Sequence, residues 1–198
     1  MAMTTANNSS EADRNERSVT EPKQVKVWDI AVRVFHWSLV TSFAIAWLSA
    51  DEWDKLHDIA GYIVAGLVGF RLIWGFIGSK HARFTDFVYN PVSVFNYLKD
   101  TIYHKAKRYI GHNPVGGAMI IALLLSLVTI TASGIAMTSN MFWGIEWVEE
   151  VHEISANLTL VLIGLHIAGV IFSSFSHSEN LVKAMITGRK RDLSDQDK

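Results

Sequence analysis

The residues of this chain best suited to chemistry are histidines within or beside long apolar stretches. His152 and His166 are 14 positions apart, which on an α-helix puts both near one face and separates them by about 21 Å. His36 lies 14 residues before Ala50, where its own apolar stretch ends, and His57 stands just before the next stretch, as His152 does before the last. We therefore expect His57 to lie level with His152. By the same spacing, His36 is expected level with His166.

Two imidazoles on facing helices can bind one metal between them. A neutral imidazole nitrogen is a good axial ligand for haem iron, and one imidazole on each side of a porphyrin gives a six-coordinate haem suited to electron transfer. The chain contains no cysteine, which excludes covalent attachment through C-x-x-C-H, so such a haem would be a b haem held by ligation and packing. The levels predict two haems. One would be bound by His36 and His166, the other by His57 and His152.

Other interpretations of these histidines are open. A single histidine inside a membrane is more often a hydrogen-bonded contact between helices than a ligand, but four at two matched depths favour ligands. A zinc site needs three or four donors at one depth, and each level supplies two. A proton relay would favour carboxylates, and the apolar stretches contain none. The remaining histidines have no partner of matching depth, and we interpret them as solvated or interfacial: His81, His104, His112 and His177.

Three more residues are candidates for holding a cofactor. Arg71 lies 14 residues after His57, near the level of His36, and could either pair with haem propionates or extend to the membrane interface. Arg33 is a second propionate candidate. Gly61 follows His57 by one helical turn, where a missing side chain would let a porphyrin face approach.

Four apolar stretches must position these residues. Residues 34–50 and 115–137 carry no charge, residues 59–78 carry only Arg71, and residues 154–175 contain no ionisable group except His166. Each is about as long as a helix needs to be to cross a hydrocarbon core of about 30 Å. A soluble all-α bundle is the alternative, but its helices would need a polar face that these stretches lack. The predicted fold is an all-α, integral membrane four-helix bundle with haem between the helices, and its spans are about 30–50, 58–78, 115–137 and 153–175.

The ends of the chain are polar. Residues 1–24 have too few large apolar side chains to offset the entropy of ordering and are predicted to be a disordered tail. They contain no apolar core of a signal peptide. Residues 25–192 are predicted to form the four-helix domain, and residues 193–198 a short polar tail.

Charge predicts the orientation. The formal net charge is −1, which argues against a nucleic-acid partner because binding phosphates needs an excess of Lys and Arg. The two ends and the loop 79–113 contain 16 Lys and Arg, whereas the loops 51–58 and 138–153 contain one. The positive-inside rule therefore puts both termini in the cytoplasm. The two outward loops contain eight carboxylates and the single cation Lys55.

Four segments of the sequence resemble a known family. They are VWDIAVRVFHW, LHDIAGYIVAGLVGFRLIWGFIGSKHARF, GHNPVGGAM and VHEISANLTLVLIGLHIAGVIFSSFSHSENLVKAMITGRKR. Over residues 25–192 the chain is similar to the bacterial cytochrome b561 and nickel-hydrogenase b-type cytochromes, which are four-helix dihaem membrane proteins. The resemblance implies bis-histidine b haems at the four positions already singled out. One departure is Ala31, where relatives often have proline.

From this resemblance we expect a membrane-bound electron-transport protein of the bacterial cytoplasmic (inner) membrane. It would carry electrons between the quinone pool of a respiratory chain and a periplasmic partner, either a c-type cytochrome or an oxidoreductase subunit, and would be a carrier rather than an enzyme. One alternative is an oxidoreductase that oxidises superoxide and reduces quinone. Another is the membrane anchor of a hydrogenase-like complex, and a haem-free interaction or transport protein is the outsider. Membrane lipid is an expected partner, and a homodimer is left open.

Overall fold

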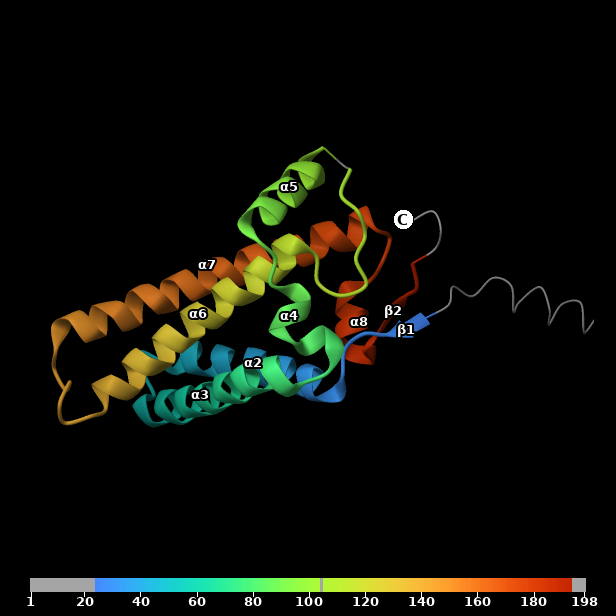
Figure 1. The fold of residues 1–198 in the computed structure, drawn as a ribbon. Coiled ribbons are helices and arrows are strands. Elements are labelled where there is room, and N and C mark those ends of the chain that lie inside the picture. Colours follow the sequence, from blue (N-terminus) through green and yellow to red (C-terminus); the bar gives the residue numbers. More distant parts are fainter. Residues whose placement is uncertain (1–23, 104, 194–198) are drawn as a thin grey trace, which may run out of the picture.

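In the computed structural model, which describes residues 24–103 and 105–193, four long helices form the body of the molecule (Figure 1). Short elements gather at one end of these helices. The elements in chain order are β1 (Gln24–Lys26), α2 (Ile30–Ser49), α3 (Asp54–Ile77), the 3-10 turn η1 (Lys80–Ala82), α4 (Phe84–Phe87), α5 (Pro91–Ile102), α6 (Pro114–Met137), α7 (Glu146–Ser176), α8 (Leu181–Thr187) and β2 (Arg189–Arg191).

The four predicted spans correspond to α2, α3, α6 and α7, each long and apolar enough to cross a membrane. Two helices begin earlier than predicted, α3 at Asp54 and α7 at Glu146. Hydropathy marks only the part of a helix that sits in hydrocarbon, whereas charged first turns remain helical in water. With 31 residues, α7 is about 46 Å long and extends well beyond a hydrocarbon core of about 30 Å. As a result His57 and His152 lie within helices and not just before them.

Side-chain caps fix where two of these helices begin. The Asp29 carboxylate accepts a hydrogen bond of 2.7 Å from the Val32 amide and closes the first turn of α2. The same carboxylate accepts bonds from the Trp74 indole and the Ser79 hydroxyl, which tie the start of α2 to the end of α3. At α6, Asn113 caps the Gly116 amide and proline occupies the first helical position.

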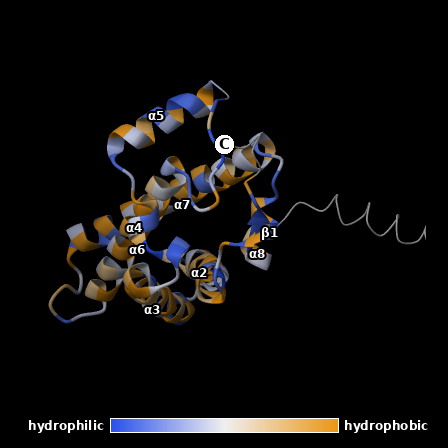
Figure 2. Cartoon of the chain, turned by 45° about the vertical axis from the view of Figure 1, so that its right-hand side comes forward, coloured by the Kyte–Doolittle hydropathy of each residue, from blue (hydrophilic) through white to orange (hydrophobic). Residues whose placement is uncertain are grey.

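The bundle consists of two helical hairpins. One is α2 with α3, the other α6 with α7, and α3 packs on α6 to join them. Buried Val64 and Val68 of α3 meet Leu127 of α6 at this junction. Inside the second hairpin, the hydroxyls of Ser126 and Thr159 are 2.8 Å apart and both residues are buried. Hydrophobic residues dominate the long helices (Figure 2), and many of their large side chains are exposed, as lipid-facing surfaces require.

The two ends of the described chain meet at one end of the bundle. Strands β1 and β2 pair antiparallel, with Val25 opposite Lys190. The turns α2–α3 and α6–α7 lie at the opposite end, toward the left of Figure 1. The predicted tails fall outside the described residues, apart from Gln24, which begins β1, and Leu193.

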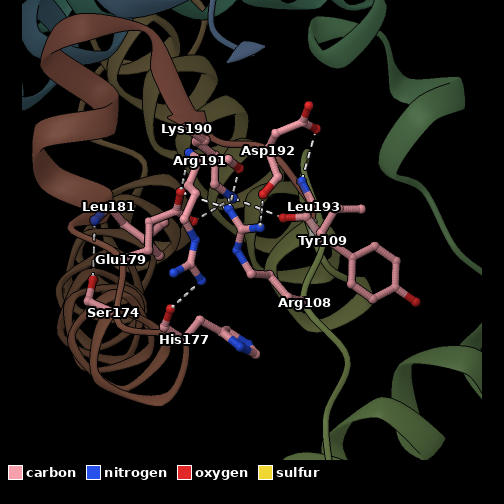
Figure 3. Close-up of polar contacts among 10 residues, drawn as sticks. All are labelled: Arg108, Tyr109, Ser174, His177, Glu179, Leu181, Lys190, Arg191, Asp192 and Leu193. Atoms are coloured by element: carbon pink, nitrogen blue, oxygen red, sulfur yellow. Dashed lines mark hydrogen bonds and ion pairs between the residues drawn. The ribbon is translucent and has the colours of Figure 1, made fainter. Parts of the chain in front are cut away.

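A buried ion-pair network fastens β2 and the turn between α7 and α8 to the loop that precedes α6 (Figure 3). The Arg108 guanidinium donates a hydrogen bond of 2.9 Å to the Glu179 carboxylate, and the Lys190 ammonium lies 3.6 Å from the other oxygen of that carboxylate. Arg108 also donates to the Asp192 carbonyl. The three charged side chains are each less than a tenth exposed.

Candidate functional site

The four histidines predicted as ligands form two facing pairs. The ring centroids of His36 in α2 and His166 in α7 are 6.5 Å apart, and we call these two residues the inner pair. The ring centroids of His57 in α3 and His152 in α7 are 6.1 Å apart, and these two residues are the outer pair. The residues that sequence spacing put at equal depth are therefore brought together. Their role as ligands stays a prediction.

The outer pair has the hydrogen bonds that orient metal-bound histidines. Nδ1 of His57 is 2.8 Å from the Ala46 carbonyl, and Nδ1 of His152 is 3.0 Å from the Ile130 carbonyl. A carbonyl only accepts, so each Nδ1 carries the proton and donates, which leaves Nε2 with a free lone pair. The Ser133 hydroxyl is also 3.3 Å from Nδ1 of His152. Such partners fix the tautomer and make the free nitrogen a better ligand.

The inner pair has fewer hydrogen bonds than the outer pair. Nδ1 of His36 is buried without a hydrogen-bond partner. Both rings are partly buried. Because this pair and the outer pair share α7, one helix sets the spacing of both levels.

The spacing within each pair suits an iron ion between two imidazoles. A histidine nitrogen lies about 2 Å from the metal that it binds, so the ring centroids of two imidazoles on opposite sides of one ion are about 6 Å apart. The separations of both pairs agree with this value. Moreover, α7 packs along α6, whereas its described residues make no comparable packing with α2 or α3. The histidines thus face each other between helices that are not in close contact, as a flat macrocycle requires.

The three accessory candidates differ in their surroundings. Arg71 is 4% exposed, and its Nη1 is buried without a partner. Arg33 already donates a hydrogen bond to the Ile186 carbonyl of α8, although its Nε is buried without a partner. A Cβ at Gly61 would meet no atom within 4 Å, so that side of α3 is open.

His112 was expected to be solvated or interfacial, and its ring is packed against aromatic side chains rather than solvated. Its ring centroid lies 4.5 Å from that of Trp28, with the two rings tilted by 41°, and 5.1 Å from that of Phe87. Its Nδ1 is buried without a partner. Burial above all, and then the positive charge of Arg71, lower the pKa of His112 to about 3. One signal for this burial was present in the sequence. His112 directly precedes the Asn113–Pro114 start of α6, and a residue there is held against the end of the bundle.

The structure describes two of the other three histidines outside the pairs. His81 is paired with Asp86 at 2.9 Å, and the His177 carbonyl accepts a hydrogen bond from Arg191. His104 lies outside the described residues.

The end of the bundle nearest the outer pair is acidic. All eight carboxylates of its two turns are exposed, as is the single cation Lys55. Three exposed tryptophans lie among them: Trp53, Trp143 and Trp147. A surface of this kind attracts cationic partners.

Comparison with known proteins identifies similar chains. The model of a family described as prokaryotic cytochrome b561 matches residues 27–188. A probable Ni/Fe-hydrogenase B-type cytochrome subunit from Rhizobium leguminosarum bv. viciae is 21% identical over 90% of this chain and 94% of its own length. The protein of the same description from Bradyrhizobium diazoefficiens is 23% identical over 89% of each chain. No solved structure matches the chain significantly.

Proposed function

The chain belongs to the prokaryotic cytochrome b561 family, and we propose that it carries electrons across the membrane between the quinone pool and a redox partner at the outer face. Family membership and four apolar helices make it a multi-pass b-type cytochrome of the bacterial inner membrane that acts in electron transport. The observation that carries the finer proposal is the pair of histidine pairs at two levels of one bundle.

In this proposal each histidine pair holds one b haem. His57 and His152 bind through Nε2 while each Nδ1–H donates to a backbone carbonyl, which keeps both rings in a fixed orientation. His36 and His166 bind the second haem. Bound haem supplies a one-electron redox centre. Gly61 leaves space beside α3, and Arg71 and Arg33 are the candidates for the propionates.

A protein that carries electrons across a membrane needs redox centres at more than one depth, and the two histidine pairs would provide them. Fourteen residues of α7 separate its two histidines, or about 21 Å along the helix. That length spans most of a hydrocarbon core of about 30 Å. The positive-inside distribution supports an orientation in which both termini and the inner pair are on the cytoplasmic side.

The acidic outer end supports a cationic partner, such as a c-type cytochrome, or an oxidoreductase subunit. The names of the relatives favour a second candidate of the same kind, in which the chain is the membrane subunit of a hydrogenase-like complex. Co-purification of the tagged chain from its own membranes separates the two, because a stable enzyme subunit is retained through purification and a transient cytochrome partner is not. The acidic surface does not favour an anionic substrate such as superoxide.

Haem analysis of histidine variants tests the proposal. Pyridine haemochrome analysis should find two b haems per chain. His36→Ala and His166→Ala should lose the same spectral component. His57→Ala and His152→Ala should lose the other one. His81→Ala is the matched control, since His81 is bonded to Asp86 in a loop, and it should keep both haems.

Two results would contradict the proposal. One is a wild-type chain with fewer than two haems. The other is loss of the same component from His36→Ala and His57→Ala. Orientation has its own test. A reporter that works only in the cytoplasm should be active when fused after Lys198, and a reporter that works only outside should be active when inserted in the α6–α7 turn.

A further inference from the structure

Arg71 is a buried cation with an unused hydrogen-bond donor. It is 4% exposed, and its Nη1 is buried without a partner. The guanidinium lies 5.2 Å from the ring centroid of Phe84 and 5.6 Å from that of Phe87. These ring faces stabilise the positive charge in part, but they do not accept a hydrogen bond from Nη1. The guanidinium also keeps its charge, because it does not lose its proton in a protein. A buried donor in this state is costly unless an acceptor meets it.

Arg71 lies at the level of the inner pair. Its neighbour Phe70 packs against Phe35, the neighbour of His36, with ring centroids 6.3 Å apart. One turn further along α3, Trp74 donates a hydrogen bond to Asp29, just before α2 begins. The part of α3 that carries Arg71 therefore packs beside the part of α2 that carries His36, toward the end of the bundle where the chain ends meet.

His112 approaches the same region from the loop before α6. Its ring is 5.1 Å from the Phe87 ring, which Arg71 also contacts, and Phe87 is fully buried. Its backbone is held in place, because the Tyr89 hydroxyl donates to its carbonyl at 3.4 Å and the next residue, Asn113, caps α6. Its lowered pKa keeps the ring neutral, so it has one N–H to donate and no charge to add.

Two unsatisfied polar groups, Nη1 of Arg71 and Nδ1 of His112, thus lie around one buried aromatic ring. A carboxylate satisfies both, because it neutralises the guanidinium and its second oxygen accepts from a neutral imidazole. Arg33 is less suited, since it already donates to Ile186.

We propose that Arg71 and His112 together form a carboxylate-binding site that holds a propionate of the haem at the inner pair. Arg71 supplies the charge and His112 a second hydrogen bond. The inference rests on the proposed function, since it needs a haem at the inner pair, and it adds a cofactor contact that lies far from that pair in the sequence.

The test compares haem b with its dimethyl ester, whose propionates are uncharged. The full chain with His57→Ala, in which only the inner haem is expected, is freed of haem and reloaded with either form. Release of haem to excess apomyoglobin is then followed by absorbance. In this parent the ester should leave at least about tenfold faster than haem b, since it lacks a charge-assisted contact. Arg71→Gln and His112→Leu should each bring the ratio of the two rates closer to one. Lys80→Gln, which removes an exposed cation at the same end, should leave the ratio unchanged.

The outcomes separate this inference from the proposed function. A parent that binds no haem refutes the proposed function and the inference with it. A parent that binds both forms and releases them at equal rates refutes the inference alone. So does a ratio that neither variant lowers. If one variant does not reload, the other decides, because each is expected to lower the ratio by itself.

Discussion

Glu179→Gln is the change whose effect can be worked out most fully from the structure. One oxygen of the Glu179 carboxylate accepts from Arg108 at 2.9 Å and from the Arg191 amide at 2.8 Å. The other oxygen lies 3.6 Å from the Lys190 ammonium. The amide of glutamine has no charge and leaves two buried cations without their carboxylate. Removing one partner of a buried ion pair costs about 3–5 kcal/mol.

The lower part of that range is expected, because burial already disfavours the charged form of Lys190, so less stabilisation is lost there. Burial lowers the pKa of Lys190 despite the attraction of Glu179, so at this residue burial outweighs pairing. The Arg108 guanidinium stays charged and bears most of the cost. We therefore expect a loss of about 3 kcal/mol in the free energy that holds β1, β2 and α8 in place.

Amide hydrogen exchange measures this loss locally. The Val27 amide donates to the Gly188 carbonyl at 2.9 Å and is exposed only when the strand pair opens. A loss of about 3 kcal/mol should speed its exchange about a hundredfold. Exchange at Leu127, in the core between α3 and α6, should not change. Asp100→Asn, which neutralises an exposed carboxylate at the same end, is the matched control and should leave both amides as they are.

The effect should also depend on pH. Burial would raise the pKa of Glu179, but the hydrogen bond from Arg108 and the charge of Lys190 lower it below its ordinary value of 4.5. A carboxyl whose pKa is lower in the folded protein stabilises it fully above the ordinary pKa, and this stabilisation is lost as the pH falls through the folded pKa. Wild type and Glu179→Gln should therefore differ most at neutral pH and converge in acid. A Val27 amide that exchanges equally fast in both proteins at neutral pH would refute the reasoning.

Three more predictions concern the helices. Thr159→Val removes the bond to the buried Ser126 hydroxyl and should destabilise the α6–α7 hairpin by about 0.5–2 kcal/mol, seen as a lower thermal midpoint in detergent; an unchanged midpoint would show that the bond is not stabilising. Asp29→Ala removes the α2 cap and should cost about 1–2 kcal/mol, measured as faster amide exchange in the first turn of α2 and not in its last. Phe95→Cys, in a chain without native cysteine, should carry a spin label that oxygen relaxes more than a water-soluble nickel chelate does, because the exposed apolar face of α5 meets lipid. A label at Asn96→Cys, on the polar face, should be relaxed more by the nickel chelate than by oxygen. Equal accessibility at both positions would show that the apolar face of α5 is in water and not in lipid.

Local patterns in the sequence were enough to predict the four long helices and the facing of the histidines. A hydrophobic run of membrane length and a 14-residue spacing are both properties of one continuous helix. Because α7 is one continuous helix over Glu146–Ser176, the 14-residue spacing of His152 and His166 is kept, and each meets its partner on another helix.

Features that depend on segments far apart were not predicted. Strands β1 and β2 are three polar or mixed residues each, with no periodicity to mark them. The burial of His112 depends on Trp28 and Phe87, which come from two other parts of the chain, so its own surroundings in the sequence indicate a surface loop. The early start of α7 was missed for the opposite reason, since its charged first turns carry no hydropathy signal.

The pairing of β1 with β2 sets the order in which the protein can be completed. β1 is among the first described residues to be synthesised, and the Gly188 carbonyl that accepts from the Val27 and Trp28 amides is among the last. The partners of Arg108, at Glu179 and Asp192, also come after the fourth span. All four helices can therefore enter the membrane while this end of the bundle is still open. Trp28, which packs on His112, is held by the Gly188 carbonyl and is fixed only after that residue has been synthesised. Until then, a cofactor can enter from this end without any part of the fold having to open.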